Sequence, residues 1–151
     1  MSMRRKMKYY AIQPEVAGGW GSNTLVEDRS IHPPRVKKLH YQFDGWLGDV
    51  ILETFPCYIV TEEAKRNVEA AGATGVKFDE VEITTSEGFE ELCPRLHLPH
   101  FAWLRVEGDP GRDDFGIAPA PDFRLVISER MLNILKPLGI SHALIEDFGS
   151  P

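Results

Sequence analysis

The sequence has little cysteine and no long apolar run. Its 151 residues include two cysteines, Cys57 and Cys93, which are too few for the disulfide framework of a small secreted domain. No apolar stretch approaches the roughly 18–20 residues that a membrane-spanning helix needs. We therefore expect a cytoplasmic protein with reduced thiols and no membrane partner.

The N-terminal segment also lacks the pattern of a secretory signal. Four of its first eight residues are basic: Arg4, Arg5, Lys6 and Lys8. The chain then continues into Tyr9 and Tyr10, without the apolar stretch of about 7–15 residues that a signal peptide carries. We expect residues 1–8 to form a flexible basic tip.

Basic residues are in deficit along the rest of the chain. The sequence has 17 lysines and arginines against 23 aspartates and glutamates, a net charge of −6. Without the four basic residues of the tip, the remaining body has a net charge of about −10. A body with this charge repels the phosphate backbone of nucleic acids and attracts basic surfaces. We expect a basic protein partner and no direct binding of nucleic acid.

Two segments, residues 57–83 and 123–148, repeat one strand–helix–strand pattern. In each, a short apolar strand is followed by a hydroxyl residue and a glutamate, beginning at Thr61 and at Ser128, which predicts the first turn of a helix. Apolar residues then recur at helical spacing until a glycine predicts the end of the helix. We expect both units to share one mixed β-sheet with their helices on one face, in an α+β domain.

The rest of the chain predicts a few further elements. Strands are expected at residues 7–12, 39–43, 76–83 and 100–106, and a short capped helix at residues 86–92. Glycine and proline predict loops at residues 16–23 and 107–122. Residues 50–52 are compatible with a strand or a helical turn. At this length we expect residues 1–151 to form a single domain.

Motifs that carry familiar chemistry are missing. Residues 18–21 are glycine-rich, but they lack the lysine of a phosphate-binding loop and the strand–turn–helix context of a dinucleotide-binding fingerprint. No serine stands in a Gly-x-Ser-x-Gly turn. Cys57 lies in an apolar strand, which favours an inert buried thiol. We expect no catalytic residues.

Cys93, His97 and His100 lie close together in the sequence and are residue types that bind metal ions. A fourth ligand is missing, Pro94 and Pro99 interrupt the segment, and the spacing matches none of the usual zinc patterns. We therefore expect no metal and no cofactor. A small cytoplasmic enzyme that uses these three side chains stays an open alternative, because a cysteine beside a histidine can act as a nucleophile.

An acidic segment lies in the loop expected at residues 107–122. It has neither the alternating ligands of a calcium loop nor a visible third catalytic partner. A solvated acidic loop is the simplest interpretation, and a surface that binds a basic partner is the functional one. The residues that we expect to contact this partner are Asp109, Asp113, Asp114, Phe115 and, from the preceding strand, Trp103.

Several short motifs carry a resemblance to a known bacterial family. They lie at residues 41–49, 59–62, 75–78, 98–104, 113–116 and 125–129. The chain resembles, over residues 38–148, small immunity proteins of polymorphic-toxin and contact- or type VI-delivered systems, the family first defined on a myxobacterial immunity domain. The family signature is a valine–serine–glutamate entry from a strand into a leucine-rich helix, followed by a return strand. This sequence has such an entry at Thr61 and again at Ser128.

The resemblance implies a function without catalysis. An immunity protein binds a cognate secreted toxin domain and neutralises it by occluding its active site, and toxin-contacting residues vary within the family. Nuclease and nucleobase-deaminase toxins hold a polyanion and are often basic, so an acidic protein suits them as an inhibitor. The alternatives are the small enzyme described above and a self-associating adaptor.

Overall fold

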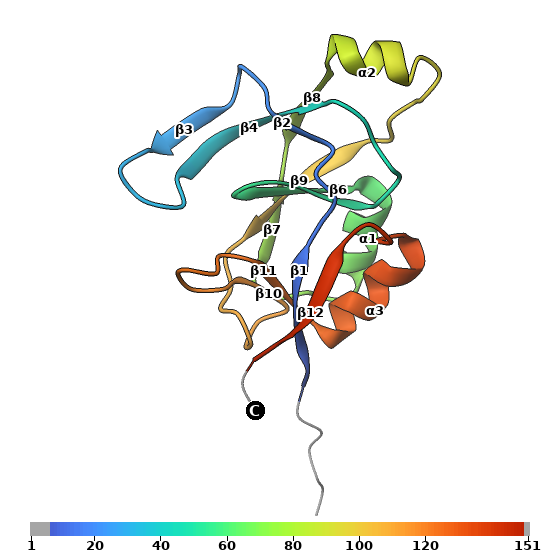
Figure 1. Ribbon diagram of the computed structural model, residues 1–151. Helices are drawn as coiled ribbons and strands as arrows, with labels where there is room; N and C mark the ends of the chain where they lie inside the picture. Colours follow the sequence, from blue (N-terminus) through green and yellow to red (C-terminus); the bar gives the residue numbers. More distant parts are fainter. Residues whose placement is uncertain (1–6, 150–151) are drawn as a thin grey trace, which may run out of the picture.

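Three four-stranded sheets and three helices make up residues 7–149, the part of the chain that the computed structural model describes (Figure 1). Residues 1–6 of the expected basic tip lie outside the described residues. The predicted α+β class is confirmed. The helices are α1 (Glu62–Ala70), α2 (Glu87–Leu92) and α3 (Glu129–Leu138). None of the described helices is both long enough and apolar enough to cross a membrane.

The first and second sheets are arranged alike: in each, the strand before a helix and the strand after it lie on either side of a strand from elsewhere in the chain. In spatial order, the first consists of β5 (Ile51–Thr54), β6 (Cys57–Thr61), β9 (Phe101–Val106) and β7 (Val76–Asp79). The second consists of β10 (Phe115–Ile117), β11 (Leu125–Ser128), β1 (Tyr9–Gln13) and β12 (Leu144–Phe148). The third sheet contains β2 (Gly18–Trp20), β4 (Arg35–Phe43), β3 (Leu25–Asp28) and β8 (Val81–Thr85).

The two repeated units each form their own sheet. Helix α1 connects β6 to β7, and the antiparallel strand β9 lies between these two strands. Helix α3 connects β11 to β12, and β1 lies between them in the same way. The expectation that both units share one mixed sheet is therefore wrong: β6 and β7 belong to one antiparallel sheet, and β11 and β12 belong to another. Parallel pairing occurs within the third sheet, between β4 and β8.

The two long helices begin as the sequence predicts. The Thr61 side chain accepts a hydrogen bond from the Ala64 backbone N–H at 3.2 Å, and Ser128 accepts one from Met131 at 3.4 Å. Each cap satisfies a backbone donor that the first turn leaves free. The helices pack against each other and against the strands that precede them (Figure 1).

Strand β6 of the first sheet is buried on both faces. All five residues of β6 are buried, and its side chains alternate between two hydrophobic clusters. Tyr58 and Val60 join the cluster beneath α1 and α3, which also includes residues of the second sheet. Cys57 and Ile59 join the cluster that faces the third sheet, together with Tyr41 and other residues of β4. The first sheet is therefore the central layer.

Three expected elements differ in the structure. Residues 76–83 form two strands, β7 and β8, which separate at Glu80 and belong to different sheets. The glycine-rich segment forms β2 instead of a loop. A Cβ atom at Gly18 would lie 1.9 Å from the Gln42 carbonyl oxygen, so the missing side chain lets β2 approach β4. The segment expected to be a loop at residues 107–122 contains β10, and residues 50–52 lead into and form part of β5.

We expect Gly75→Ala to destabilise the fold more than Gly72→Ala. Both glycines have positive φ, +78° and +65°, a conformation that costs other residues about 1–2 kcal/mol. A Cβ atom at Gly75 would also lie 2.4 Å from the Phe115 carbonyl oxygen, whereas one at Gly72 has nothing within 4 Å. The additional cost at Gly75 should be about 1–3 kcal/mol. Urea denaturation of both variants measures the difference, and equal losses would contradict the close approach.

Candidate functional site

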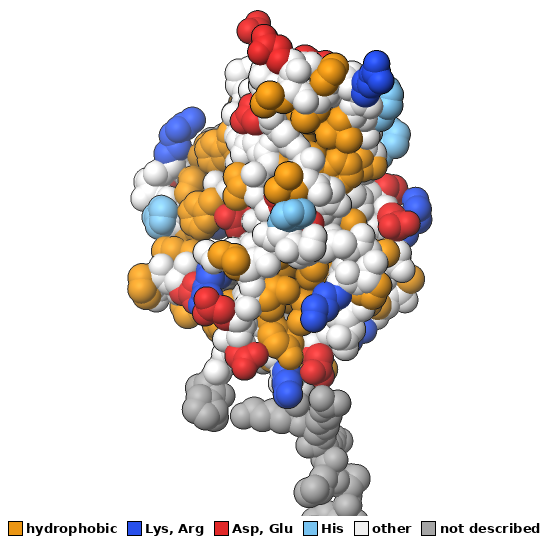
Figure 2. Space-filling model, turned by 45° about the vertical axis from the view of Figure 1, so that its right-hand side comes forward, with side chains coloured by type: hydrophobic (Ala, Val, Ile, Leu, Met, Phe, Trp, Pro, Cys, Tyr) orange, Lys and Arg blue, Asp and Glu red, His pale blue; other side chains and the backbone are white. Residues whose placement is uncertain are grey.

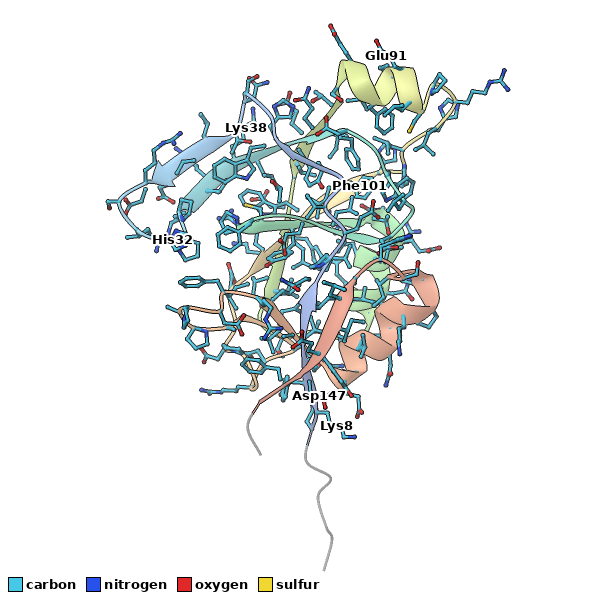
Figure 3. All side chains as sticks on the ribbon, viewed as in Figure 1. Lys8, His32, Lys38, Glu91, Phe101 and Asp147 are labelled. Atoms are coloured by element: carbon cyan, nitrogen blue, oxygen red, sulfur yellow. The ribbon has the colours of Figure 1, made fainter. Side chains whose placement is uncertain are left out.

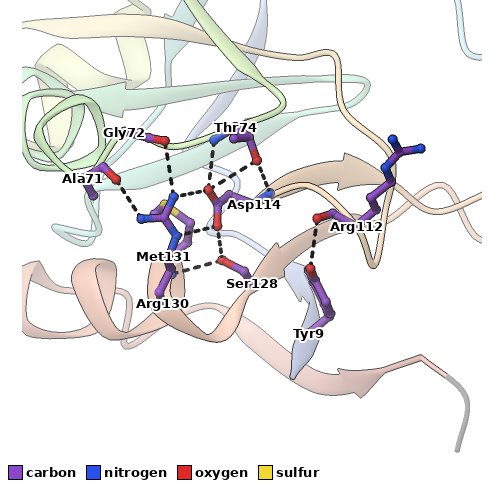
Figure 4. Close-up of polar contacts among 9 residues, drawn as sticks. All are labelled: Tyr9, Ala71, Gly72, Thr74, Arg112, Asp114, Ser128, Arg130 and Met131. Carbon is purple, nitrogen blue, oxygen red and sulfur yellow. Dashed lines mark hydrogen bonds and ion pairs between the residues drawn. The ribbon is translucent and has the colours of Figure 1, made fainter. Parts of the chain in front are cut away.

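Asp114, expected to contact a partner, is instead a buried junction between the two repeated units. Its side chain accepts hydrogen bonds from the Thr74 backbone N–H at 2.9 Å and from the Ser128 hydroxyl at 2.7 Å (Figure 4). Arg130 donates to it through Nε at 2.9 Å and also through Nη2. Thr74 follows α1 and Ser128 begins α3, so one carboxylate holds both units together.

Arg130 extends this junction to the end of α1. Its guanidinium donates to the backbone oxygens of Ala71 at 2.7 Å and Gly72 at 3.3 Å. These carbonyls lie where α1 ends, and a cation there also interacts favourably with the helix dipole. Arg130 belongs to α3, so its contacts connect the start of one helix to the end of the other.

The environment of Asp114 stabilises its charged form. Burial alone raises the pKa of the carboxyl group, since the carboxylate loses its water. Hydrogen bonds from Arg130, Ser128 and Thr74 outweigh this effect and hold the pKa of Asp114 below its ordinary value. The resulting stabilisation is complete above the unfolded-state pKa of about 3.9, and it is lost as the pH falls through the lower folded-state value.

Phe115 and Trp103 are also buried, so the expectation that they are exposed to a partner is wrong. Phe115 packs in the cluster beneath α1 and α3, and Trp103 packs in the cluster that faces the third sheet. The Arg105 guanidinium lies 4.3 Å from the centre of the Trp103 ring. No local pattern in the sequence indicated the burial of Asp114, because its partners Thr74, Ser128 and Arg130 are 14 or more residues away along the chain.

Asp109 and Asp113 remain near the surface. The Asp109 side chain is largely exposed and lies 3.7 Å from the Arg112 guanidinium. The Asp113 carboxylate accepts a hydrogen bond from the Asp109 backbone N–H at 2.7 Å, and Tyr9 donates to the Arg112 carbonyl at 3.1 Å (Figure 4). These bonds order the turn. A contact between Asp109 or Asp113 and a partner stays a prediction.

The residues of the enzyme alternative are not brought together. Cys93 follows α2 and is half-buried, while His97 and His100 are exposed. Within residues 7–149 these three side chains do not form a group with ligand atoms close to one another. Burial raises the pKa of the Cys57 thiol to about 12, which disfavours the thiolate that a cysteine nucleophile needs.

A different polar group does form, from residues that sequence reasoning missed. Glu15, Asp49 and His142 come from three separate loops, and one ligand atom from each lies within 4.8 Å of the others. The His142 Nδ1 atom is 3.0 Å from Asp49 Oδ1. Asp49 and His142 are 93 residues apart, so no local spacing could have indicated the group.

The segment from α2 to the start of β9 forms an acidic and apolar surface, which we call the α2–β9 surface. Its acidic residues are Glu87, Glu90 and Glu91, all exposed, and its exposed apolar residues are Leu92 and Leu96. Leu92 is 79% exposed, the largest exposed fraction among the described large apolar side chains. Helix α2 has no lysine or arginine, and the exposed Arg95 follows it within the same segment. The helix lies at one end of the molecule (Figure 1).

An aromatic base supports this surface. Phe89 anchors α2 in the cluster that faces the third sheet, and the half-buried Leu98 and Phe101 pack against the same cluster. Trp46 packs edge-to-face on Phe101, with 5.9 Å between the ring centres. Figure 2 shows hydrophobic side chains gathered below the acidic groups at the top of the molecule. Figure 3 places Glu91 on the outer side of α2 and Phe101 nearer the interior.

An apolar cleft lies elsewhere on the surface. It has a volume of about 350 Å³, and its walls include Ile31, Phe55, Arg105 and Phe123. Ile31 and Phe55 are exposed. The charged residues in its wall are Arg35, Arg105 and Glu107, so the cleft lacks the acidic surplus of the α2–β9 surface.

We expect Asp114→Asn to lower the free energy of unfolding by about 3 kcal/mol at pH 7, because the amide cannot accept all the donors around it. The difference from wild type should shrink below about pH 4, as the wild-type carboxyl group becomes protonated. Asp113→Asn is the matched control and should cost less than about 1 kcal/mol. Urea denaturation between pH 7 and pH 3 measures both variants. A difference that is independent of pH would contradict the role of the charge.

Two comparisons with known proteins gave no relative. No protein-family model matches the chain, and no curated protein matches its sequence. The resemblance to immunity proteins stays an expectation from the motifs.

Proposed function

We propose that this chain is an immunity protein that binds a basic toxin domain through the α2–β9 surface and occludes the toxin's active site. The observation that carries the proposal is the surplus of exposed glutamates on α2 beside the exposed Leu92 and Leu96. An acidic rim around desolvated apolar contacts is the arrangement that gives fast and tight association with a basic partner.

The glutamates of α2 differ from the acidic side chains that are paired within residues 7–149. Acidic partners there neutralise five cations: Glu82 pairs with Lys38, Glu62 with Lys65, Asp79 with Arg105, Asp122 with Arg124 and Asp114 with Arg130. Within residues 7–149 the three glutamates of α2 have no lysine or arginine at ion-pair distance. The carboxylate of Glu90 accepts a hydrogen bond from the Thr85 hydroxyl. Because this donor is neutral, it does not cancel the negative charge that Glu90 offers to a partner.

The position of α2 suits occlusion. The helix lies at one end of the molecule (Figure 1), so its outer side can enter a concave site without a clash from the sheets. A toxin that acts on nucleic acid needs a positive active site to hold the polyanion. Three glutamates on a short helix would occupy the positions of phosphates there. The proposal assigns the chain to the cytoplasm, where Cys57 and Cys93 remain reduced.

The direct test uses a toxin domain, sought first among the genes next to the gene for this chain. An equimolar amount of the purified chain should abolish the activity of the purified toxin domain, and the two should elute together in gel filtration. Full toxin activity at a micromolar excess of the chain would overturn the proposal. Larger assemblies of the chain alone, together with full toxin activity, would support the adaptor alternative.

Charge reversal on α2 should weaken this complex. We expect the triple variant Glu87→Lys, Glu90→Lys and Glu91→Lys to slow association about 10–100-fold at low salt, because the steering field is removed. The matched control is Glu63→Lys, Glu80→Lys and Asp147→Lys, which changes the net charge equally at exposed sites elsewhere. Biolayer interferometry at several salt concentrations measures both. An equal effect of the two triple variants would show that total charge matters and that α2 does not.

The apolar part of the surface gives a second test. Leu92→Ser should leave the free energy of unfolding within about 0.5 kcal/mol of wild type, because Leu92 is exposed. It should weaken toxin binding about tenfold or more, since a buried apolar contact is lost. Phe55→Ser, in the apolar cleft, is the control and should bind as wild type. If Phe55→Ser bound the toxin more weakly and Leu92→Ser bound as wild type, the binding site would lie at the cleft and the proposed surface would be wrong.

A further inference from the structure

The group formed by Glu15, Asp49 and His142 has the composition of a metal site. Glu15 follows β1, Asp49 precedes β5, and His142 lies between α3 and β12. Their ligand atoms, two carboxylate oxygens and one imidazole nitrogen, all lie within 4.8 Å of one another. Ligands at about 2.0–2.2 Å from a common ion lie within this distance of each other.

Backbone donors hold both carboxylates in place. The Leu47 N–H donates to Glu15 Oε2 at 2.7 Å, and the Asp49 N–H donates to Glu15 Oε1 at 3.3 Å. The His142 N–H donates to Asp49 Oδ2 at 2.9 Å. Each of these oxygens has a second lone pair, so the carboxylates can bind an ion without giving up these bonds. Such outer contacts orient metal ligands in proteins.

The charge of the group is unbalanced. Glu15 is 6% exposed and Asp49 is 2% exposed, so two carboxylates lie close together away from water. Among residues 7–149 the ion-pair partner of Asp49 is His142, which carries at most one positive charge, and Glu15 has no cation at ion-pair distance. Buried charges without partners are costly. A divalent cation would balance both carboxylates.

We propose that Glu15, Asp49 and His142 bind one divalent transition-metal ion of the Zn²⁺ type. A set of one nitrogen and two oxygen ligands suits Zn²⁺, whereas Mg²⁺ prefers oxygen ligands alone and keeps several of its waters. The His142 side chain is 43% exposed, so an ion can enter from solvent and keep a water ligand on that side. The site is independent of the function proposed for the α2–β9 surface.

A bound ion would join the second repeated unit to the segment that precedes the first sheet. The segment that contains Asp49 precedes the first sheet, and the loop that contains His142 belongs to the second unit. The same segments already meet where the Val50 N–H donates to the Gly139 carbonyl at 2.9 Å. The ion would be held by these two segments and Glu15, which are brought together only in the folded chain. It should therefore stabilise the folded state selectively.

Isothermal titration of the metal-free full chain with ZnCl₂ tests the proposal. We expect one Zn²⁺ per chain with a dissociation constant in the micromolar range. At a Zn²⁺ concentration about 100 times this constant, Tm should rise by about 5–10 °C. MgCl₂ at the same concentration should leave Tm unchanged. No binding of Zn²⁺, or an equal effect of Mg²⁺, would overturn the proposal.

Variants assign the ion to its ligands. His142→Ala and Glu15→Gln should each weaken Zn²⁺ binding at least about tenfold, and circular dichroism would show that both fold. The matched control replaces two other exposed histidines, His97→Ala with His100→Ala, and should bind as wild type. Loss of binding in this control, or a thiolate charge-transfer band with Co²⁺, would assign the metal to Cys93 and its neighbours and overturn the site.

Discussion

The burial of strand β6 on both faces is the constraint on which the rest of the structure depends. Strand β6 has no exposed residue, and its alternate side chains belong to two different hydrophobic clusters. One cluster requires α1, α3 and the second sheet, and the other requires the third sheet. Neither outer layer can be removed without exposing one face of β6 to water, at a cost of about 25 cal/mol for each Å² of apolar surface.

The repeated unit explains how the chain builds the first two layers. Each unit places a helix between two strands and leaves a gap for a third strand, which comes from elsewhere in the chain. Strand β9 follows the first unit and β1 precedes the second, so the units are completed from opposite directions in the sequence. Asp114 and Arg130 then connect the end of α1 to the start of α3. A carboxylate that is fully hydrogen-bonded at this point orders both helix termini together.

The function proposed for the chain uses a part of the molecule that this framework leaves free. Helix α2 is held to the body through Phe89, while its other side chains are exposed. A short helix with one buried anchor can change its exposed residues without disturbing the core. An immunity protein needs this property if its toxin-contacting residues are to vary, and here it separates the proposed binding surface from the residues that determine the fold.

The sequence by itself determined the local elements. The caps at Thr61 and Ser128, the helix that begins after Ser86 and the strands around residues 39–43 and 100–106 depend on neighbouring residues, and all are confirmed. Only the tertiary structure decided which sheet each strand joins and which polar residues are buried. Asp114 bonds to Thr74 across 40 residues, and Asp49 to His142 across 93. Contacts at such separations follow from the packing of whole layers, and no local spacing in the sequence records them.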